Sequence, residues 1–185
     1  MLAQDQTGAI TWPTRETWIV AVDYERGRRV VFGRPGAPVV SLAEAVVASC
    51  SIPGWYEPKT INGRRYVDGG VRSSTSLDVL ARTDLDEVYV LAPMASYVLD
   101  RPCNLATRLE RVVRRVLTAG LDAEVNKVRA AGVRVTVLTP GVEDLIAMGA
   151  NLMDPRARHR VLETSLRTSA AALADQPGPS QRLAA

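Results

Sequence analysis

The chain has few of the side chains that build metal centres, disulfide frameworks and nucleic-acid interfaces. Its 185 residues include one histidine and two cysteines, and aromatic residues make up 5%. Cys50 and Cys103 are too few and too distant in sequence to suggest a disulfide framework, and no Cys/His spacing fits a zinc site. No dense basic run with interleaved aromatics occurs, although the net charge is +3. We therefore expect no metal, no cofactor and no nucleic-acid partner.

Long apolar runs are also missing. No stretch approaches the roughly 20 apolar residues that would span a bilayer, and residues 1–8 are polar and lack the apolar segment of a signal peptide. The hydrophobic share of 46% and the charged share of 23% are ordinary for a globular protein. These features predict a cytoplasmic chain that is at most peripheral to a membrane, and long enough for one domain with a sizeable core.

The first half of the chain is predicted to form two β-hairpins with a helix between them. Asn62-Gly63 is a strong hairpin signal, because both positions tolerate positive φ. Ser41 can cap the helix, with Glu44 as its capping-box partner. The predicted elements are a hairpin of residues 18–24 and 28–32, a buried helix of residues 42–49, and a hairpin of residues 59–61 and 64–67.

The second half is predicted to contain a strand–helix–strand crossover with parallel strands. Apolar residues recur at helical spacing between Asn104 and Ala130, which indicates one long amphipathic helix. The flanking strands are expected at residues 87–92 and 133–138. Short helices are expected at residues 76–82 and after Pro140-Gly141, and a last one from Pro155 to about Leu173. With no repeat and no linker, the pattern predicts a single α/β unit.

Asp68 is the residue that best fits a chemical role. It ends a predicted strand and is followed by Gly69 and Gly70, which let the backbone turn away and present the carboxylate. Strand ends border the ligand crevice in open α/β sheets, so an ionised Asp68 could act as a general base. The alternative is that Asp68 is only a turn residue, since Asp-Gly pairs are common in turns for their backbone tolerance.

The wider context resembles a known family. Ala48-Ser49-Cys50-Ser51-Ile52-Pro53-Gly54, an aromatic pair, a proline, a hairpin and then Tyr66-Val67-Asp68-Gly69-Gly70-Val71 follow one another in an order similar to the C-terminal half of the patatin-like phospholipases. The resemblance covers roughly residues 18–168 and is densest over residues 45–80. It implies a three-layer α/β/α fold, here incomplete, with parallel strands and β-hairpins, and hydrolysis of lipid acyl esters by a Ser–Asp dyad.

In that family an aspartate in an Asp-Gly-Gly or Asp-Gly-Ala motif activates the serine, so the resemblance assigns the general base to Asp68 and the motif to Asp68, Gly69 and Gly70. The nucleophile motif Gly-x-Ser-x-Gly is not in this sequence, and neither is the glycine-rich oxyanion loop. The resemblance therefore implies that residues 1–174 are the C-terminal part of such a domain. The two prolines, the glycine and the polar residues of positions 175–185 predict a disordered tail. We expect no ester hydrolysis by this chain alone.

Residues beside the motif have two interpretations each. Pro53, Gly54 and Trp55 are candidates for the substrate wall, and Trp55 with Tyr56 could form a lip that meets lipid. Packing of the two aromatic rings under the loop is the favoured alternative. The arginines of the long helix could meet an anionic membrane, but a solvated helix face is favoured (Arg108, Arg111, Arg115).

Three further candidates are given structural readings. Cys50 is interpreted as an unreactive thiol at a buried helix end, because reactive thiols need an electropositive, accessible setting. Asp84, Asp86 and Glu87 are interpreted as a solvated loop rather than a metal site, and His159 as a surface residue without a partner.

Three hypotheses follow. The chain is part of a patatin-like lipid acyl hydrolase with Asp68 as base, or a catalytically dead remnant that binds lipid or a protein, or an unrelated α/β binding module. In the first case the chain would bind a lipid or ester substrate once it is completed by the missing half that carries the nucleophile. Because a sheet without the nucleophile's strand would expose edges and apolar faces, we also expect the chain to aggregate or to associate with itself.

Overall fold

The computed structural model describes residues 11–98, 105–149, 151 and 154–174. It divides into two compact units, Met1–Ser76 and Leu77–Ala185, where the sequence had suggested one. The tail predicted to be disordered, residues 175–185, lies outside the described residues. Each unit has its own hydrophobic core, so the units are treated separately below.

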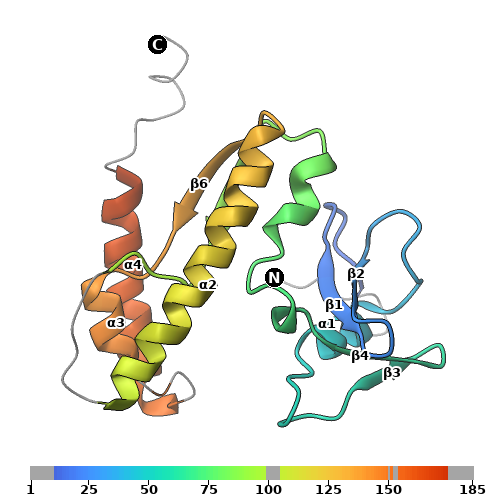
Figure 1. The fold of residues 1–185 in the computed structure, drawn as a ribbon, viewed down its shortest axis with the longest axis horizontal. Helices are drawn as coiled ribbons and strands as arrows, with labels where there is room; N and C mark the ends of the chain where they lie inside the picture. The colour runs from blue at the N-terminus through green and yellow to red at the C-terminus, as the bar shows by residue number, and fades with distance from the viewer. Residues whose placement is uncertain (1–10, 99–104, 150, 152–153, 175–185) are drawn as a thin grey trace. The chain divides into compact units, whose positions relative to one another are not determined.

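The first unit is built on a four-stranded antiparallel sheet with the order β2-β1-β4-β3 (Figure 1). β1 (Ile19–Asp23) forms the predicted hairpin with β2 (Arg28–Phe32), and β3 (Lys59–Ile61) forms the second with β4 (Arg64–Asp68). β1 also pairs with β4, and this pairing joins the two hairpins into one sheet. Asn62 and Gly63 have φ values of 49° and 75°, which confirms the turn predicted between β3 and β4.

One helix, α1 (Leu42–Ser49), packs on this sheet, and the predicted capping box of Ser41 and Glu44 is formed. Phe32 and Tyr66 are buried beneath it, with their rings edge to face at 5.2 Å between centroids. The expectation that α1 is buried was only half correct. Leu42, Ala45 and Ala48 face the core, whereas Val46 and Val47 are exposed.

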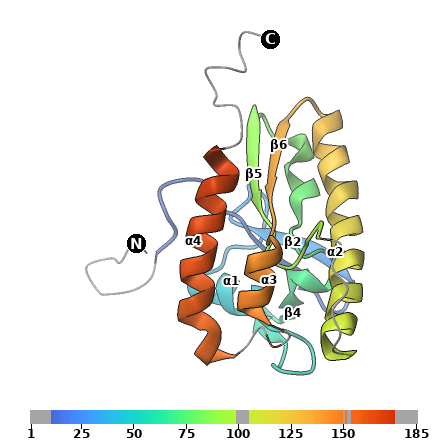
Figure 2. The same cartoon turned by 90° about the vertical axis from the view of Figure 1, so that its left-hand side faces the viewer.

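The second unit contains the predicted crossover. β5 (Glu87–Leu91) and β6 (Arg134–Leu138) pair in parallel, and α2 (Leu105–Ala130) connects them. α3 (Val142–Met148) packs against α4 (Arg158–Ala174), and these two helices and α2 lie on opposite sides of the two strands (Figures 1 and 2). A 3₁₀-helix, η2 (Leu77–Arg82), stands where a short helix was predicted and packs on α2.

The two halves of α2 bury different kinds of residue. Leu121, Val125 and Val128 enter the core of the second unit, as amphipathic spacing predicts. In the N-terminal half the buried side chains are instead Arg111 and Arg114, and most of the large apolar residues of that half are exposed (Leu105, Leu109, Val112, Val113, Val116).

The fold class is thus mixed α/β, with one antiparallel and one parallel sheet. A three-layer α/β/α arrangement for the whole chain stays a prediction. The strand that ends at Asp68 lies in the antiparallel sheet, so the rule for parallel strand ends, from which a crevice was inferred, does not apply to it. None of the described helices is long and apolar enough to cross a membrane.

Candidate active site around Asp68

Asp68 is the last residue of β4 and is fixed from two directions. It pairs with Ala21 of β1, and its backbone N–H donates to the carbonyl oxygen of Ser51 at 3.0 Å. Ser51 follows the end of α1, so this bond ties the helix end to the strand end. The composite motif read from the sequence, a helix end followed by a hairpin and Asp-Gly-Gly, is therefore brought together in space.

The carboxylate of Asp68 caps the turn that follows it. Its Oδ1 accepts a hydrogen bond from the backbone N–H of Gly70 at 2.7 Å and begins a short 3₁₀-helix, η1 (Gly69–Val71). The turn role considered for Asp68 is therefore real. Within the described residues this is the only hydrogen bond of the carboxylate, and the residue is half-buried, so Oδ2 is left available to accept a proton.

The two glycines leave space that the site requires. A Cβ at position 69 would lie 2.6 Å from the carbonyl oxygen of Val20, so only glycine lets η1 approach β1 this closely. A Cβ at position 70 would lie 3.0 Å from Oδ1 of Asp68 itself. Both glycines of the motif therefore help to hold the Asp68 carboxylate in its position.

The serines near Asp68 are engaged elsewhere. The Oγ of Ser49 donates to the carbonyl of Val20 and that of Ser51 to the carbonyl of Val47, each at 2.8 Å. The Oγ of Ser73 accepts backbone N–H groups of the next turn. Within the described residues no serine hydroxyl is bonded to Asp68, so this part of the chain contains no Ser–Asp dyad.

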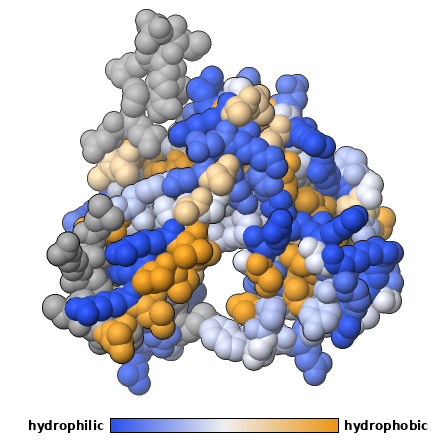
Figure 3. Space-filling view, in the orientation of Figure 1, coloured by the Kyte–Doolittle hydropathy of each residue, from blue (hydrophilic) through white to orange (hydrophobic). Residues whose placement is uncertain are grey.

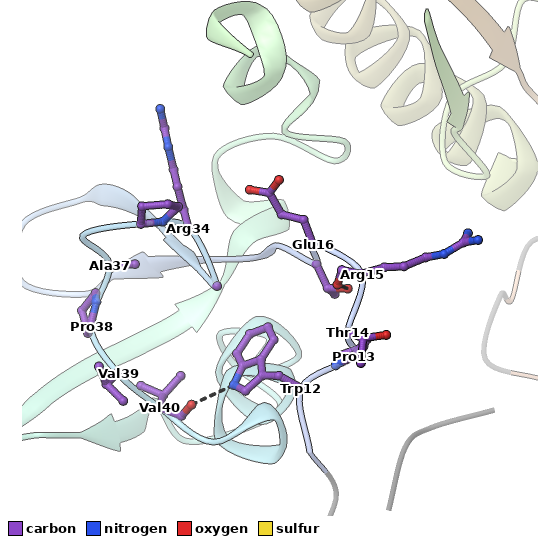
Figure 4. Close-up of a pocket in the computed structure, with 13 residues that line it drawn as sticks. Trp12, Pro13, Thr14, Arg15, Glu16, Arg34, Ala37, Pro38, Val39 and Val40 are labelled. Atoms are coloured by element: carbon purple, nitrogen blue, oxygen red, sulfur yellow. Dashed lines mark hydrogen bonds between the residues drawn. The ribbon is translucent and has the colours of Figure 1, made fainter. Parts of the chain in front are cut away.

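A surface cavity of about 410 Å³ lies elsewhere in the first unit and was not foreseen from the sequence. It forms where the chain entering β1 passes the loop after β2, and the indole Nε1 of Trp12 donates to the carbonyl of Val40 at 2.9 Å across it (Figure 4). Asp68 does not line this cavity. Its walls mix prolines with apolar and polar residues, a composition that carries no sequence signal for a catalytic site.

The loop after α1 is exposed, contrary to the favoured expectation. Pro53 and Gly54 face solvent, and Trp55 and Tyr56 are 66% and 60% exposed. Backbone N–H groups of Trp55 and Tyr56 both donate to the carbonyl of Ile52, which makes this a compact turn. The two rings therefore do not pack beneath the loop and remain available for an external contact.

Several secondary candidates were placed differently from expectation. Cys50 is an exposed free thiol at the C-cap of α1, not a buried one. His159 is a surface residue as expected, but it has a neighbour on its own helix, Glu163 at 3.5 Å. Arg111 is buried and pairs with Glu110, so the three helix arginines do not form one solvated face. Within the described ranges no group of three His, Cys, Asp or Glu residues could hold a metal ion.

Comparison with protein families gives a match for the segment that holds this site. Residues 15–81 match the patatin-like phospholipase family. The matched segment contains both hairpins, α1, the exposed loop and the whole Asp-Gly-Gly motif. The resemblance read from the sequence is thereby confirmed over residues 15–81, while its extension to residue 168 stays a prediction.

Proposed function

We propose, from the match of residues 15–81 to the patatin-like phospholipases, that this chain supplies the acidic half of a Ser–Asp lipid acyl hydrolase, with Asp68 as the general base. The observation that carries the proposal is the geometry of the Asp68 carboxylate. Oδ1 is fixed by the N–H of Gly70, and among the described residues Oδ2 has no hydrogen-bond partner, so the group is oriented and can still accept a proton.

The proposal requires a nucleophile from outside these 185 residues, because no Gly-x-Ser-x-Gly occurs in them. Removing the nucleophile of such a catalytic unit lowers the rate about a million-fold. Loss of oxyanion donors removes a further factor of roughly a hundred to a thousand. We therefore expect no turnover of a short-chain nitrophenyl ester by the purified chain, and turnover that Asp68→Ala abolishes would contradict this.

The role of Asp68 is tested by joining the chain to a segment with the nucleophile. The genomic sequence upstream of Met1 should encode an in-frame Gly-x-Ser-x-Gly, and co-expression of that segment should restore ester hydrolysis. A stop codon or an unrelated gene there would favour the catalytically dead remnant.

Asp68→Asn then separates the two roles of the side chain in the restored enzyme. Its amide oxygen can still accept the N–H of Gly70 but cannot take a proton from serine. Activity should fall by about a hundred to ten thousand-fold while stability is kept. An Asp68→Asn enzyme with full activity would leave only the turn role.

The exposed loop favours a second function, contact with a lipid surface, which is compatible with an active enzyme or with a dead remnant. Trp55 and Tyr56 present amphipathic rings of the kind that lie at the boundary between membrane and water. We expect Trp55→Ser/Tyr56→Ser to reduce co-sedimentation with phospholipid vesicles. Tyr89→Ser, which removes a 51% exposed ring from β5, is the matched control. Equal binding by both variants would argue against the loop.

A further inference from the structure

The outward side of α2 carries an apolar stripe that its own unit does not cover. Six exposed residues are separated by 4, 3, 4, 3 and 4 positions, and we call them the outer seam (Leu105, Leu109, Val112, Val116, Ala119, Ala123). Leu109 and Val116 are 66% and 68% exposed. Figure 3 shows this apolar strip over the N-terminal half of α2, bordered by hydrophilic residues.

The outer seam is distinct from the side of α2 that stabilises the fold. Arg114, Leu121, Val125 and Val128 are buried on the opposite side, which faces β5 and β6. A surface helix needs only one apolar stripe to pack on its own domain. Alternation of 4 and 3 is the spacing at which one helix packs along another as a coiled coil. The seam therefore indicates a second helix as its partner.

We propose that the outer seam pairs antiparallel with the outer seam of a second copy of this chain. The seam runs from leucines at its N-terminal end through valines to alanines at its C-terminal end. An antiparallel pair centred on residue 114 places Leu105 opposite Ala123, Leu109 opposite Ala119, and Val112 opposite Val116. Leucine then faces alanine in the outer layers and valine faces valine in the central ones, which fills space evenly. A parallel pair would stack leucine on leucine and leave alanine facing alanine.

The residues beside the seam fit the same orientation. One side of the outer seam is lined by three charged residues spaced seven positions apart (Arg108, Arg115, Asp122). In an antiparallel pair, this side of one helix lies next to the same side of the other. Arg108 comes opposite Asp122 of the second copy, and two-fold symmetry repeats this attraction. Val113, which is exposed on the other border, faces Val113 of the second copy and widens the apolar contact. Among the three charged border residues, only Arg115 faces the same residue of the second copy, in a solvated position where like charges repel weakly.

This proposal does not depend on the proposed function, since it involves neither Asp68 nor a substrate. It identifies the outer seam as the interface for the self-association expected from the sequence. The first measurement is the mass of the full chain by light scattering over a range of concentrations. A two-fold increase in mass at high concentration is expected, and a monomer mass throughout would overturn the proposal, including the case in which another part of the same chain covers the seam.

The surface is tested with charge substitutions of equal exposure. Leu109→Glu and Val116→Glu should each return the chain to monomer mass with an unchanged far-ultraviolet circular dichroism spectrum. Leu166→Glu on α4 is the matched control, because Leu166 is also 66% exposed, and it should keep the doubled mass. Dissociation by the control alone, or a doubled mass in both seam variants, would place the interface elsewhere.

Orientation is tested by cross-linking in a background without the native cysteines (Cys50→Ser, Cys103→Ser). A short bis-maleimide should join two chains of Leu105→Cys/Ala123→Cys, because these positions face each other in an antiparallel pair. Leu105→Cys alone should remain uncross-linked. Efficient cross-linking of Leu105→Cys alone would indicate a parallel pair and overturn the antiparallel assignment.

Discussion

Replacing Gly69 with alanine should destabilise the first unit without touching the carboxylate of Asp68. The added Cβ would lie 2.6 Å from the carbonyl oxygen of Val20 and 3.1 Å from its carbon, so η1 or β1 must shift. The Val20 oxygen also accepts the hydroxyl of Ser49 at 2.8 Å, so its retreat would weaken that bond.

The magnitude follows from two opposing effects. Overpacking of this kind costs about 1–3 kcal/mol. Alanine also lowers the conformational entropy of the unfolded chain, which stabilises the folded state by about 0.4–1 kcal/mol. This gain applies here because position 69 does not have a positive φ. The net loss in the free energy of unfolding of the first unit should be about 1–2 kcal/mol.

Tryptophan fluorescence is the assay, because all three tryptophans belong to the first unit (Trp12, Trp18, Trp55). Denaturant unfolding should show a lower midpoint for Gly69→Ala with an unchanged slope. Gly70→Ala is the control, since its Cβ would meet only the end of the Asp68 side chain, at 3.0 Å, and should cost less. A Gly69→Ala chain as stable as the wild type would refute the close approach of η1 to β1 on which the site depends.

Three further changes have defined outcomes. Arg114→Met should cost about 3 kcal/mol in urea unfolding, because it breaks the buried pair with Glu110. Donors from Ser41 lower the pKa of Glu44 below its usual 4.5, so the stability that its charge adds is present above pH 4.5 and is lost as the pH falls through the folded pKa. Glu44→Gln should abolish that loss in acid unfolding curves. Partial burial and then the bond to Asp122 raise the pKa of Tyr97 to about 12, so its contribution to stability is present below pH 10 and is lost as the pH rises towards 12. Asp122→Asn should move the phenolate absorbance midpoint back towards 10.

The local signals of the first unit were sufficient to predict its elements. The Asn62-Gly63 turn and the Ser41–Glu44 capping box depend on neighbouring residues only, and both formed where the sequence placed them. The pairing of β1 with β4 depends on residues more than 40 positions apart, and no local pattern announced it. The sequence therefore predicted the hairpins but not the antiparallel sheet that joins them.

The burial of α2 could not be read from periodicity for a related reason. Apolar spacing shows that a helix has an apolar side, but not which partner covers it. In the N-terminal half the inward side is occupied by Arg114, whose guanidinium donates to the carbonyl of Pro93 at 2.6 Å and approaches the sulfur of Met148 at 3.7 Å. An arginine satisfied by tertiary partners can be buried although its sequence pattern is that of a solvated face.

The sequence singled out Asp68 as the candidate base, and that role stays a prediction, but the sequence did not indicate the geometry of its carboxylate. The sequence set the turn role of Asp68 against the catalytic role as alternatives, whereas the structure shows that the turn role leaves one carboxylate oxygen unused. A carboxylate anchored through Oδ1 loses rotational freedom, and a base that is already oriented loses less entropy when a hydroxyl is presented to Oδ2. Asp68→Ala should therefore cost both stability and activity in the completed enzyme, whereas Asp68→Asn should cost activity alone. Equal loss of stability in the two variants, measured by denaturant unfolding, would show that the charge of Asp68, and not its hydrogen bond to Gly70, holds the turn.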